Sequence, residues 1–201
     1  MSAMNIFIGS STFGETGEDV FRMLDSTGIP WNKNPTHRVL TETEVIEYAG
    51  DAVGIIAGTE PLTADVFDGL RHLKVVSRFG SGTDNLDLVR AKERGILVYS
   101  VSSDLLADSV AELTLALILN CLRNISILHR RMNSKVWKKL GGSLLKDKTV
   151  GIVGLGEIGY RVARLVRAFG AGVLYTDIED KPNAAHIPAR RTDLQTLLEL
   201  S

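Results

Sequence analysis

The sequence predicts an α/β protein built from parallel sheets, and three observations support this. Short β-branched runs alternate with helix-like stretches along the chain, a pattern typical of βαβ units. A long apolar stretch interrupts this alternation, and a glycine-rich turn between a predicted strand and a predicted helix follows it. The 201 residues are 44% hydrophobic and 23% charged, which is the composition of a globular protein with a sizeable core.

The first hundred residues are predicted to form one compact domain. Apolar positions fall on one face of a helix over 15–24. Thr41 is the expected N-cap of a second helix, and Glu44 three residues later completes a capping box. The predicted helices cover residues 15–24, 41–48, 63–70 and 85–94, the predicted strands cover 5–8, 53–57, 74–78 and 96–99, and residues 28–36 form a loop or a short edge strand.

Residues 104–129 are predicted to form one helix that is apolar on nearly all sides. Such a helix is buried between layers, domains or subunits. We therefore expect a domain boundary here, between residues 1–102 and 103–201, and a homodimer formed through this helix. Cys121 is expected to pack within it rather than to react. The apolar positions are Leu105, Leu106, Val110, Leu113, Leu117, Ile118, Cys121 and Leu122.

Composition excludes several classes of partner. The 23 Lys and Arg against 24 Asp and Glu give a net charge of −1, so neither a nucleic-acid nor an anionic-membrane partner is expected. The apolar run is shorter than the roughly 20 residues needed to span a bilayer. A lone cysteine, no zinc-type spacing of Cys and His, and a start without signal-peptide features favour the cytoplasm.

The glycine-rich turn GLGEIG, residues 154–159, follows a predicted buried strand over 148–153. Gly154 allows the tight turn, Gly156 lets the backbone approach a pyrophosphate, and Gly159 lets helix and strand pack closely. The free N–H groups at the start of the following helix attract phosphate. Arg161, Arg164 and Arg167 recur on the polar side of this helix and are interpreted as a solvated face.

A second strand over 173–176 ends in Asp177, 18 residues after Gly159. A carboxylate there accepts hydrogen bonds from the adenosine ribose hydroxyls. Glu179 and Asp180 follow, and no arginine is adjacent, so NAD is favoured over NADP. The alternative is a glycine turn that binds nothing.

A second glycine-rich segment, residues 77–85, follows the predicted strand over 74–78. Its free N–H groups and the Arg78 guanidinium are placed to receive a carboxylate at the carboxyl edge of a parallel sheet. The alternative is an ordinary turn in which Asp84 or Asn85 caps the next helix. The residues alone favour neither.

The chain resembles the D-isomer-specific 2-hydroxyacid dehydrogenases, the family that includes D-3-phosphoglycerate dehydrogenase. The resemblance covers essentially the whole chain and rests on the order and spacing of four blocks. They are AGTEPLT (57–63), LKVVSRFGSGTDNLD (73–87), VAEL (110–113) and Trp137 ahead of the glycine turn. It implies a flavodoxin-like substrate or lid domain followed by the first half of a Rossmann NAD-binding domain.

The resemblance also implies roles for individual residues. Ser81 and Gly82 would receive the carboxylate of a 2-hydroxy or 2-oxo acid, and Ser81 would also touch NAD. Arg78 matches a position that contacts the anionic end of the substrate in phosphoglycerate-type members. The remaining cofactor contacts implied are Glu157 and Ile158 over the pyrophosphate, Asp177 on the ribose and Ile178 beside it.

The chain departs from the family pattern at two places. Residues 100–103 read SVSS where the family has an Asn-Thr-Pro-like stretch. The family's catalytic Arg, Glu and His are expected beyond residue 201, so this N-terminal portion alone is expected to be inactive. The histidines match no family position and are interpreted as solvated or packing residues: His37, His72, His129 and His186. The alternatives are an NAD-responsive, corepressor-like interaction protein and an inactive truncated product.

Overall fold

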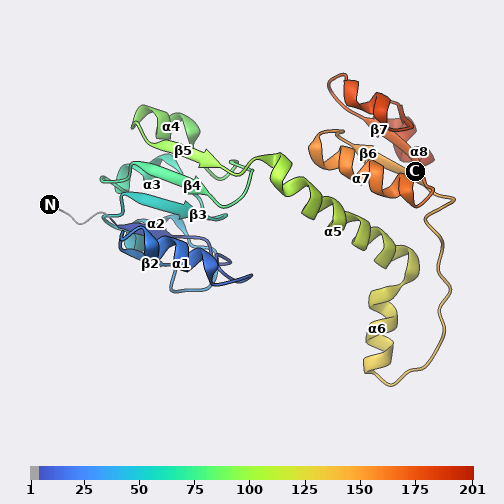
Figure 1. Cartoon of the computed structure of the whole chain (residues 1–201), viewed down its shortest axis with the longest axis horizontal. Coiled ribbons are helices and arrows are strands. Elements are labelled where there is room, and N and C mark those ends of the chain that lie inside the picture. Colours follow the sequence, from blue (N-terminus) through green and yellow to red (C-terminus); the bar gives the residue numbers. More distant parts are fainter. Residues whose placement is uncertain (1–4) are drawn as a thin grey trace. The chain divides into compact units, whose positions relative to one another are not determined.

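A computed structural model describes residues 5–201 of the chain. The chain divides into two compact units, and the boundary between them in the sequence lies between Ser102 and Ser103 (Figure 1). We call them the first unit, which ends at residue 102, and the second unit, residues 103–201. The interpretation that the chain starts without a signal peptide falls mainly on residues 1–4, which lie outside the described part.

The first unit is built on a five-stranded sheet in the order β2-β1-β3-β4-β5, with all neighbours parallel. This is the strand order of flavodoxin-like folds, so the predicted fold class is confirmed here. Of the two possibilities for residues 28–36, the structure shows the edge strand. The strands are β1 (Ile6–Ile8), β2 (Trp31–Lys33), β3 (Gly54–Ala57), β4 (Val75–Arg78) and β5 (Leu97–Ser100).

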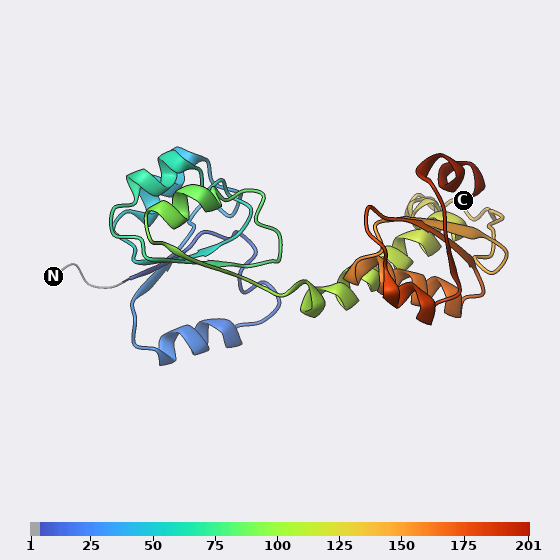
Figure 2. The same cartoon turned by 90° about the horizontal axis from the view of Figure 1, so that it is seen from above.

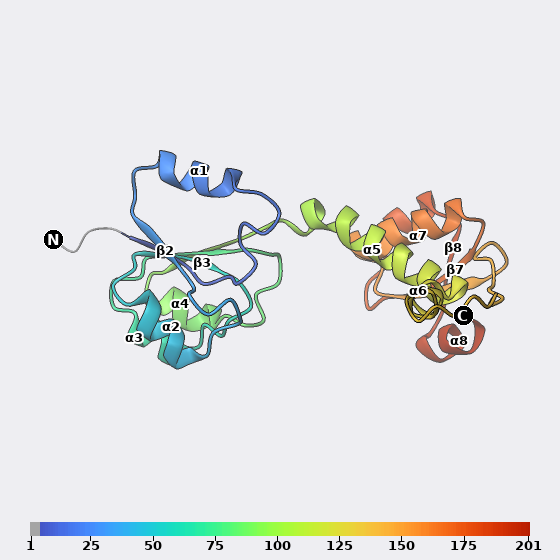
Figure 3. The ribbon, with the colours of Figure 1, turned by 90° about the horizontal axis from the view of Figure 1, so that it is seen from below.

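Helices cover both faces of this sheet. Figures 2 and 3 show α1 (Asp19–Ser26) on one face and three helices on the other. Those three are α2 (Glu42–Ala49), α3 (Ala64–Gly69) and α4 (Leu88–Glu93). The core lies under them and includes the fully buried Phe7 and Phe67. The described residues of α1 are all partly exposed, and this helix is held by Phe21, whose ring stacks on Trp31 at 5.3 Å.

Two helices of this unit begin later than predicted. α1 starts at Asp19 because residues 11–16 form turns, within which Gly14 has a φ of +87°. α4 starts at Leu88, and its N-cap is Asp87, whose side chain accepts a hydrogen bond from the Arg90 N–H. Residues 84–85 form a turn ahead of α4, and Leu86 then forms an isolated parallel bridge with Leu62.

The second unit is built on a three-stranded parallel sheet in the order β6-β7-β8. Two helices, α5 and α7, lie on one face, and α8 lies on the other (Figure 3). This is the strand order of the first half of a Rossmann fold, as predicted. The elements are β6 (Thr149–Val153), α7 (Glu157–Ala168), β7 (Gly172–Thr176), a 3-10 turn (Pro182–His186), β8 (Ala189–Arg191) and α8 (Leu194–Leu200).

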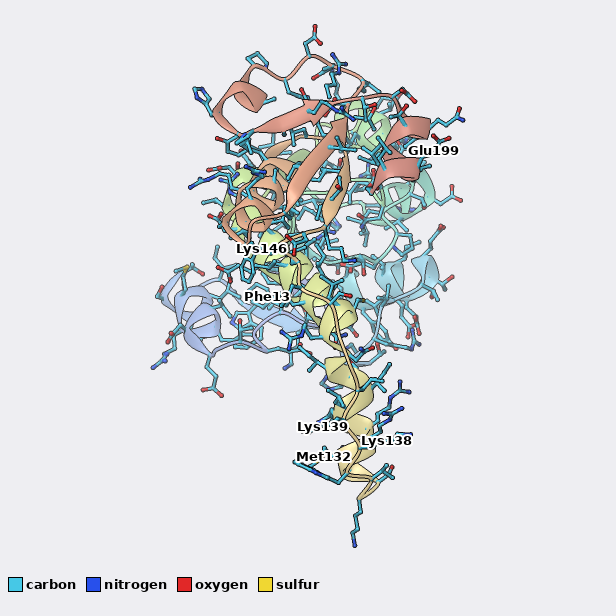
Figure 4. The ribbon with its side chains drawn as sticks, turned by 90° about the vertical axis from the view of Figure 1, so that its right-hand side faces the viewer. Phe13, Met132, Lys138, Lys139, Lys146 and Glu199 are labelled. Atoms are coloured by element: carbon cyan, nitrogen blue, oxygen red, sulfur yellow. The ribbon has the colours of Figure 1, made fainter. Side chains whose placement is uncertain are left out.

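The helix predicted over 104–129 is two helices in the structure. α5 (Ser103–Arg123) ends at Asn124, which has a φ of +56° in the left-handed region, and α6 (Ile125–Asn133) follows. Asparagine tolerates this conformation better than most residues. The Asn124 side chain also donates a hydrogen bond to the carbonyl of Gly141 at 2.8 Å. This bond ties the junction to the returning segment 134–144, which with α6 forms an arm (Figure 4).

Within the described chain this segment is largely exposed, so burial between layers or domains of one chain is wrong, and burial between subunits stays a prediction. In α5 only Ala107 and Ala111 are fully buried, whereas Leu113 is 60% and Leu117 is 55% exposed. α5 packs against α7 and the core of the second unit, whereas Leu105, Leu113 and Leu117 are more than half exposed among the described residues. Cys121 is exposed on this surface rather than packed.

Two further expectations are affected by the same lack of cover. The strand predicted as buried is β6, an edge strand whose only buried residue is Ile152.

Among the described residues, one helix, α5, meets the length and composition test for a membrane span. Core and interface helices of soluble proteins pass this test as well, and the expected absence of a membrane segment stays a prediction.

Candidate functional site

The glycine turn between β6 and α7 depends on three glycines for three different reasons. Gly154 has a φ of +89°, which a side chain would strain. A Cβ on Gly159 would stand 2.2 Å from the carbonyl oxygen of Gly154, so only glycine lets α7 lie this close to the turn. A Cβ on Gly156 would meet nothing within 4 Å. Gly156 is the N-cap of α7, and its open surface therefore leaves the helix N-terminus accessible.

Asp177, at the carboxyl end of β7, is bonded to this turn. Its Oδ2 accepts a hydrogen bond from the Leu155 N–H at 2.7 Å, and its Oδ1 accepts one from the Glu179 N–H at 3.0 Å. These bonds, above all that from Glu179, hold the pKa of the Asp177 carboxyl below its usual value. The carboxylate is therefore charged at neutral pH and stands beside the glycine turn, and each of its oxygens has a further lone pair.

A cavity of about 540 Å³ opens beside the turn. The predicted residues Gly156 and Glu157 line it, together with Arg164 of α7 and with Lys181 and His186. Lys181 and His186 come from the loop after Asp177, where no sequence pattern marked them. The remaining lining residues are Asp108, Leu155, Tyr160, Arg161 and Pro182.

Two residues that the resemblance assigns to the cofactor lie away from this cavity. Ile178 is 99% exposed. Ile158 is 39% exposed and lines a separate hollow with Gly154 and Gly159, between α5, β6 and α7. The contacts expected of these isoleucines thus remain predictions.

Arg161 corrects the interpretation of the polar face of α7. Its guanidinium forms ion pairs with Asp104 and Asp108 of α5 and with Glu157 of its own helix. The side chain is only 19% exposed. Arg161 therefore joins α5 to α7 beside the cavity, and it is not a solvated surface residue. Arg164 remains exposed at the rim of the cavity.

The second glycine-rich segment lies in the first unit, at the carboxyl end of β4. Ser81 and Gly82 are exposed. Arg78 folds over Gly80 and donates a hydrogen bond to the carbonyl of Phe79. Its Nε is buried, and no partner for it is found among the described residues. A buried guanidinium N–H is normally paired, and an anionic ligand is one partner that would satisfy it.

The alternative in which Asp84 or Asn85 caps the next helix is wrong. Asp87 caps α4, and the Asn85 side chain instead donates to the carbonyls of Gly58 and Glu60 at 3.3 and 2.6 Å. Asn85 therefore fastens the turn after β4 to the turn after β3. The amide of Asn85 can take this role because residues 84–85 form a turn and α4 begins only at Leu88.

Glu60 is a buried carboxyl group that the sequence did not reveal. It is 1% exposed, and its Oε1 accepts a hydrogen bond from the Gly58 N–H at 2.9 Å. A Cβ on Gly9 would stand 2.1 Å from that oxygen. Burial raises the pKa of the Glu60 carboxyl, and its hydrogen bonds together with the Arg78 guanidinium oppose the rise.

The structure therefore brings the predicted residues together in two groups. Gly154, Gly156, Gly159 and Asp177 meet in the second unit, with Glu157 at the same helix end. Arg78, Ser81 and Gly82 adjoin one another in the first unit. A contact of Ser81 with the cofactor involves both units and stays a prediction.

Comparison with known proteins identifies the family of the domain that contains the glycine turn. Residues 115–201 match the family model described as D-isomer specific 2-hydroxyacid dehydrogenase, NAD binding domain. A hydroxypyruvate reductase of Thermotoga maritima is 33% identical over 180 residues, which are 89% of this chain and 55% of that protein. The chain thus spans about half the length of this curated relative.

Solved structures show the same likeness over nearly the whole chain. A crystal structure of a Thermus thermophilus protein matches with a TM-score of 0.84 at 30% identity, over 98% of this chain and 62% of that chain. A D-lactate dehydrogenase of Aquifex aeolicus, solved with NAD and lactic acid, matches with a TM-score of 0.76 at 26% identity, over 98% and 58%. The chain belongs to the D-isomer specific 2-hydroxyacid dehydrogenase family, whose cofactor is NAD.

Proposed function

We propose that this chain supplies the cofactor-binding and acid-binding parts of an NAD-dependent enzyme that transfers hydride between NAD and a D-2-hydroxy acid. The observation that carries the proposal is the hydrogen bond between Asp177 and Leu155 of the glycine turn. It holds a charged carboxylate beside an open helix N-terminus, and a cavity adjoins that N-terminus. Ribose hydroxyls and a pyrophosphate need this pair of features.

The second unit would bind the nucleotide half of the cofactor. The N–H groups at Gly156 and Glu157 would face the pyrophosphate, and Asp177 would accept from the ribose hydroxyls. The open space at Gly156 fits this assignment, since a side chain there would stand between the backbone and the phosphates. Bound NAD would supply the nicotinamide carbon that exchanges hydride with C2 of the substrate.

The first unit would bind the acid. Arg78, Ser81 and Gly82 would hold the substrate carboxylate, and the buried, unpaired Nε of Arg78 supports this. A substrate held through its carboxylate keeps C2 in one orientation, which is the positioning that hydride transfer needs.

Residues 1–201 alone would bind cofactor without efficient turnover. Within the described part of the chain, one histidine, His186, lines the cavity at the glycine turn. The resemblance assigns proton transfer and carbonyl polarisation to residues outside this sequence. General acid–base catalysis contributes about 10²–10⁴ in rate. We expect no robust NADH oxidation by residues 1–201 with a panel of 2-oxo acids, and turnover at a rate typical of dehydrogenases would contradict this.

The association we propose is a homodimer in the cytoplasm. The exposed apolar residues of α5 and of the arm, among them Leu113, Leu117 and Trp137, need cover. Figure 4 shows Met132, Lys138 and Lys139 at the far end of the arm from the three-stranded sheet. A second copy of the chain would bury these surfaces.

The test of the cofactor site is Asp177→Ala. We expect NADH to bind about tenfold more weakly or worse, because a charged acceptor of two ribose hydroxyls is lost. Binding is measured by NADH fluorescence titration, with Asp147→Ala as the matched control, an exposed aspartate in the loop before β6. An equal loss of NADH affinity in the Asp177→Ala and Asp147→Ala variants would contradict the assignment. Equal affinity of the wild type for NADH and NADPH would contradict it as well.

A further inference from the structure

The end of β7 carries less negative charge than its sequence suggests. Three acids lie there, Asp177, Glu179 and Asp180. The Lys181 ammonium is 2.8 Å from Glu179 Oε2 and 3.6 Å from Asp177 Oδ1. Arg191 pairs with Asp180, and it donates a second hydrogen bond to the Asp177 carbonyl at 2.9 Å. Two cations thus offset three acids, and the net local charge is that of a single carboxylate.

Lys181 also borders the cavity at the glycine turn. Its side chain is 23% exposed and lines that cavity together with Gly156, Arg164 and His186. A ligand hydroxyl that donates to Asp177 would therefore lie within a few ångströms of the Lys181 ammonium. A phosphate on that hydroxyl would meet the carboxylate and the ammonium together.

We propose that Lys181 is a specificity-determining residue, which sets how strongly this site prefers NAD over its 2′-phosphorylated form. The inference rests on the proposed function, because it requires the adenosine ribose to lie at Asp177. In the wild type, the Asp177 charge repels a 2′-phosphate, while Lys181 weakens that repulsion. Without the Asp177 charge, the ammonium would keep its ion pair with Glu179 and would attract the phosphate with no opposing charge at Asp177.

The experiment is a double-mutant cycle read by fluorescence titration with NADH and NADPH. Asp177→Asn removes the charge and keeps a hydrogen-bond acceptor for the turn. We expect it to raise the affinity for NADPH relative to NADH by about tenfold or more. Adding Lys181→Met should remove most of this gain, and Lys181→Arg in its place should retain it. Lys92→Met, an exposed lysine of α4 in the first unit, is the control and should change neither affinity.

Each result separates specificity from a merely structural role. A loop-holding role for Lys181 would weaken NADH and NADPH alike on Lys181→Met, and that outcome overturns the inference. It is also overturned if the double variant keeps the full gain in NADPH affinity. The wild type could bind NADH while the variants show neither the gain in NADPH affinity on Asp177→Asn nor its loss on adding Lys181→Met. That result leaves the proposed function standing and refutes only the role of Lys181. A wild type that binds neither nucleotide refutes both.

Discussion

The Glu60 carboxylate is enclosed by glycines from two different strand ends. Gly9 follows β1 and Gly58 follows β3, and a Cβ on either would stand within 3 Å of a Glu60 carboxylate oxygen. These positions are distant in sequence and adjacent only because β1 and β3 pair in register. The burial of Glu60 could not be predicted for that reason, whereas the capping box of Thr41 and Glu44 is local, and it was predicted and is confirmed.

The burial of Glu60 makes a prediction about the pH dependence of stability. Its pKa is raised in the folded chain above the ordinary value of 4.5, so the folded state binds this proton more tightly than the unfolded state. Stability from this group is thus fully present below pH 4.5 and is lost as the pH rises through the folded pKa. Glu60→Gln cannot titrate and keeps an acceptor for Gly58.

We therefore expect the free energy of unfolding of Glu60→Gln, relative to wild type, to rise between about pH 4 and about pH 7. Urea unfolding at both pH values measures it. Glu47→Gln, an exposed glutamate of α2, corrects for the loss of a surface charge. A difference that is constant with pH, or that falls, would show that the Glu60 charge is not disfavoured in the fold.

Asp177 and Lys181 mark the limit of motif-based prediction at the residue scale. The position of Asp177 follows from local spacing, because a strand, a glycine turn, a helix and a second strand place its end at the first turn. The neighbours of its carboxylate depend on the path of the loop after β7, for which no motif exists. Lys181 was therefore not predicted, although it lies only four residues away.

At the scale of elements, the glycine turn allows a paired test. Gly159→Ala should destabilise the second unit by about 1–3 kcal/mol, because its Cβ would meet backbone that has no room to move. Gly156→Ala should leave stability within about 0.5 kcal/mol, since its Cβ meets nothing within 4 Å and its φ is −76°. It should nevertheless weaken NADH binding, because the Cβ would stand between the turn and the pyrophosphate.

Urea unfolding and NADH titration of the two variants measure stability and binding separately. If Gly156→Ala binds NADH as well as wild type does, the pyrophosphate does not approach this turn. If Gly159→Ala is as stable as wild type, the close packing of α7 on Gly154 is not a constraint. The two variants differ by three positions in one turn, so each serves as the matched control for the other.

Helix boundaries were predicted less well than helix identity. The apolar pattern runs through Asn124, and nothing in it distinguishes a left-handed residue from a continuing helix. The hydrogen bond from the Asn124 side chain to the Gly141 carbonyl holds the end of α5, and it joins residues that are 17 positions apart in the sequence. β8 and α8 were not predicted, because the stretch Ala189–Arg191 is short and has no strong alternation of apolar and polar residues.

At the scale of the molecule, the two parallel sheets could be predicted from the sequence. Which apolar surfaces around them stay exposed could not. Alternating strands and helices indicate the layers, but they do not say which apolar surfaces find cover within the chain. In the first unit the core closes under α2, α3 and α4. In the second unit, β6 is an edge strand and α5 keeps an exposed apolar surface, so neither is covered within the described residues.

The proposed homodimer predicts how a single charge on α5 should act. Leu117→Glu places a carboxylate on the exposed apolar surface of α5, where Leu117 is 55% exposed. Burying that charge in an interface without a partner is costly, so the variant should sediment as a monomer while its circular dichroism stays unchanged. Val89→Glu is the matched control, since Val89 on α4 is 71% exposed and lies in the first unit. Val89→Glu should leave the dimer intact.

A wild type that sediments as a monomer at high micromolar concentration contradicts the dimer. A Leu117→Glu variant that still sediments as a dimer shows that this surface of α5 does not form the interface.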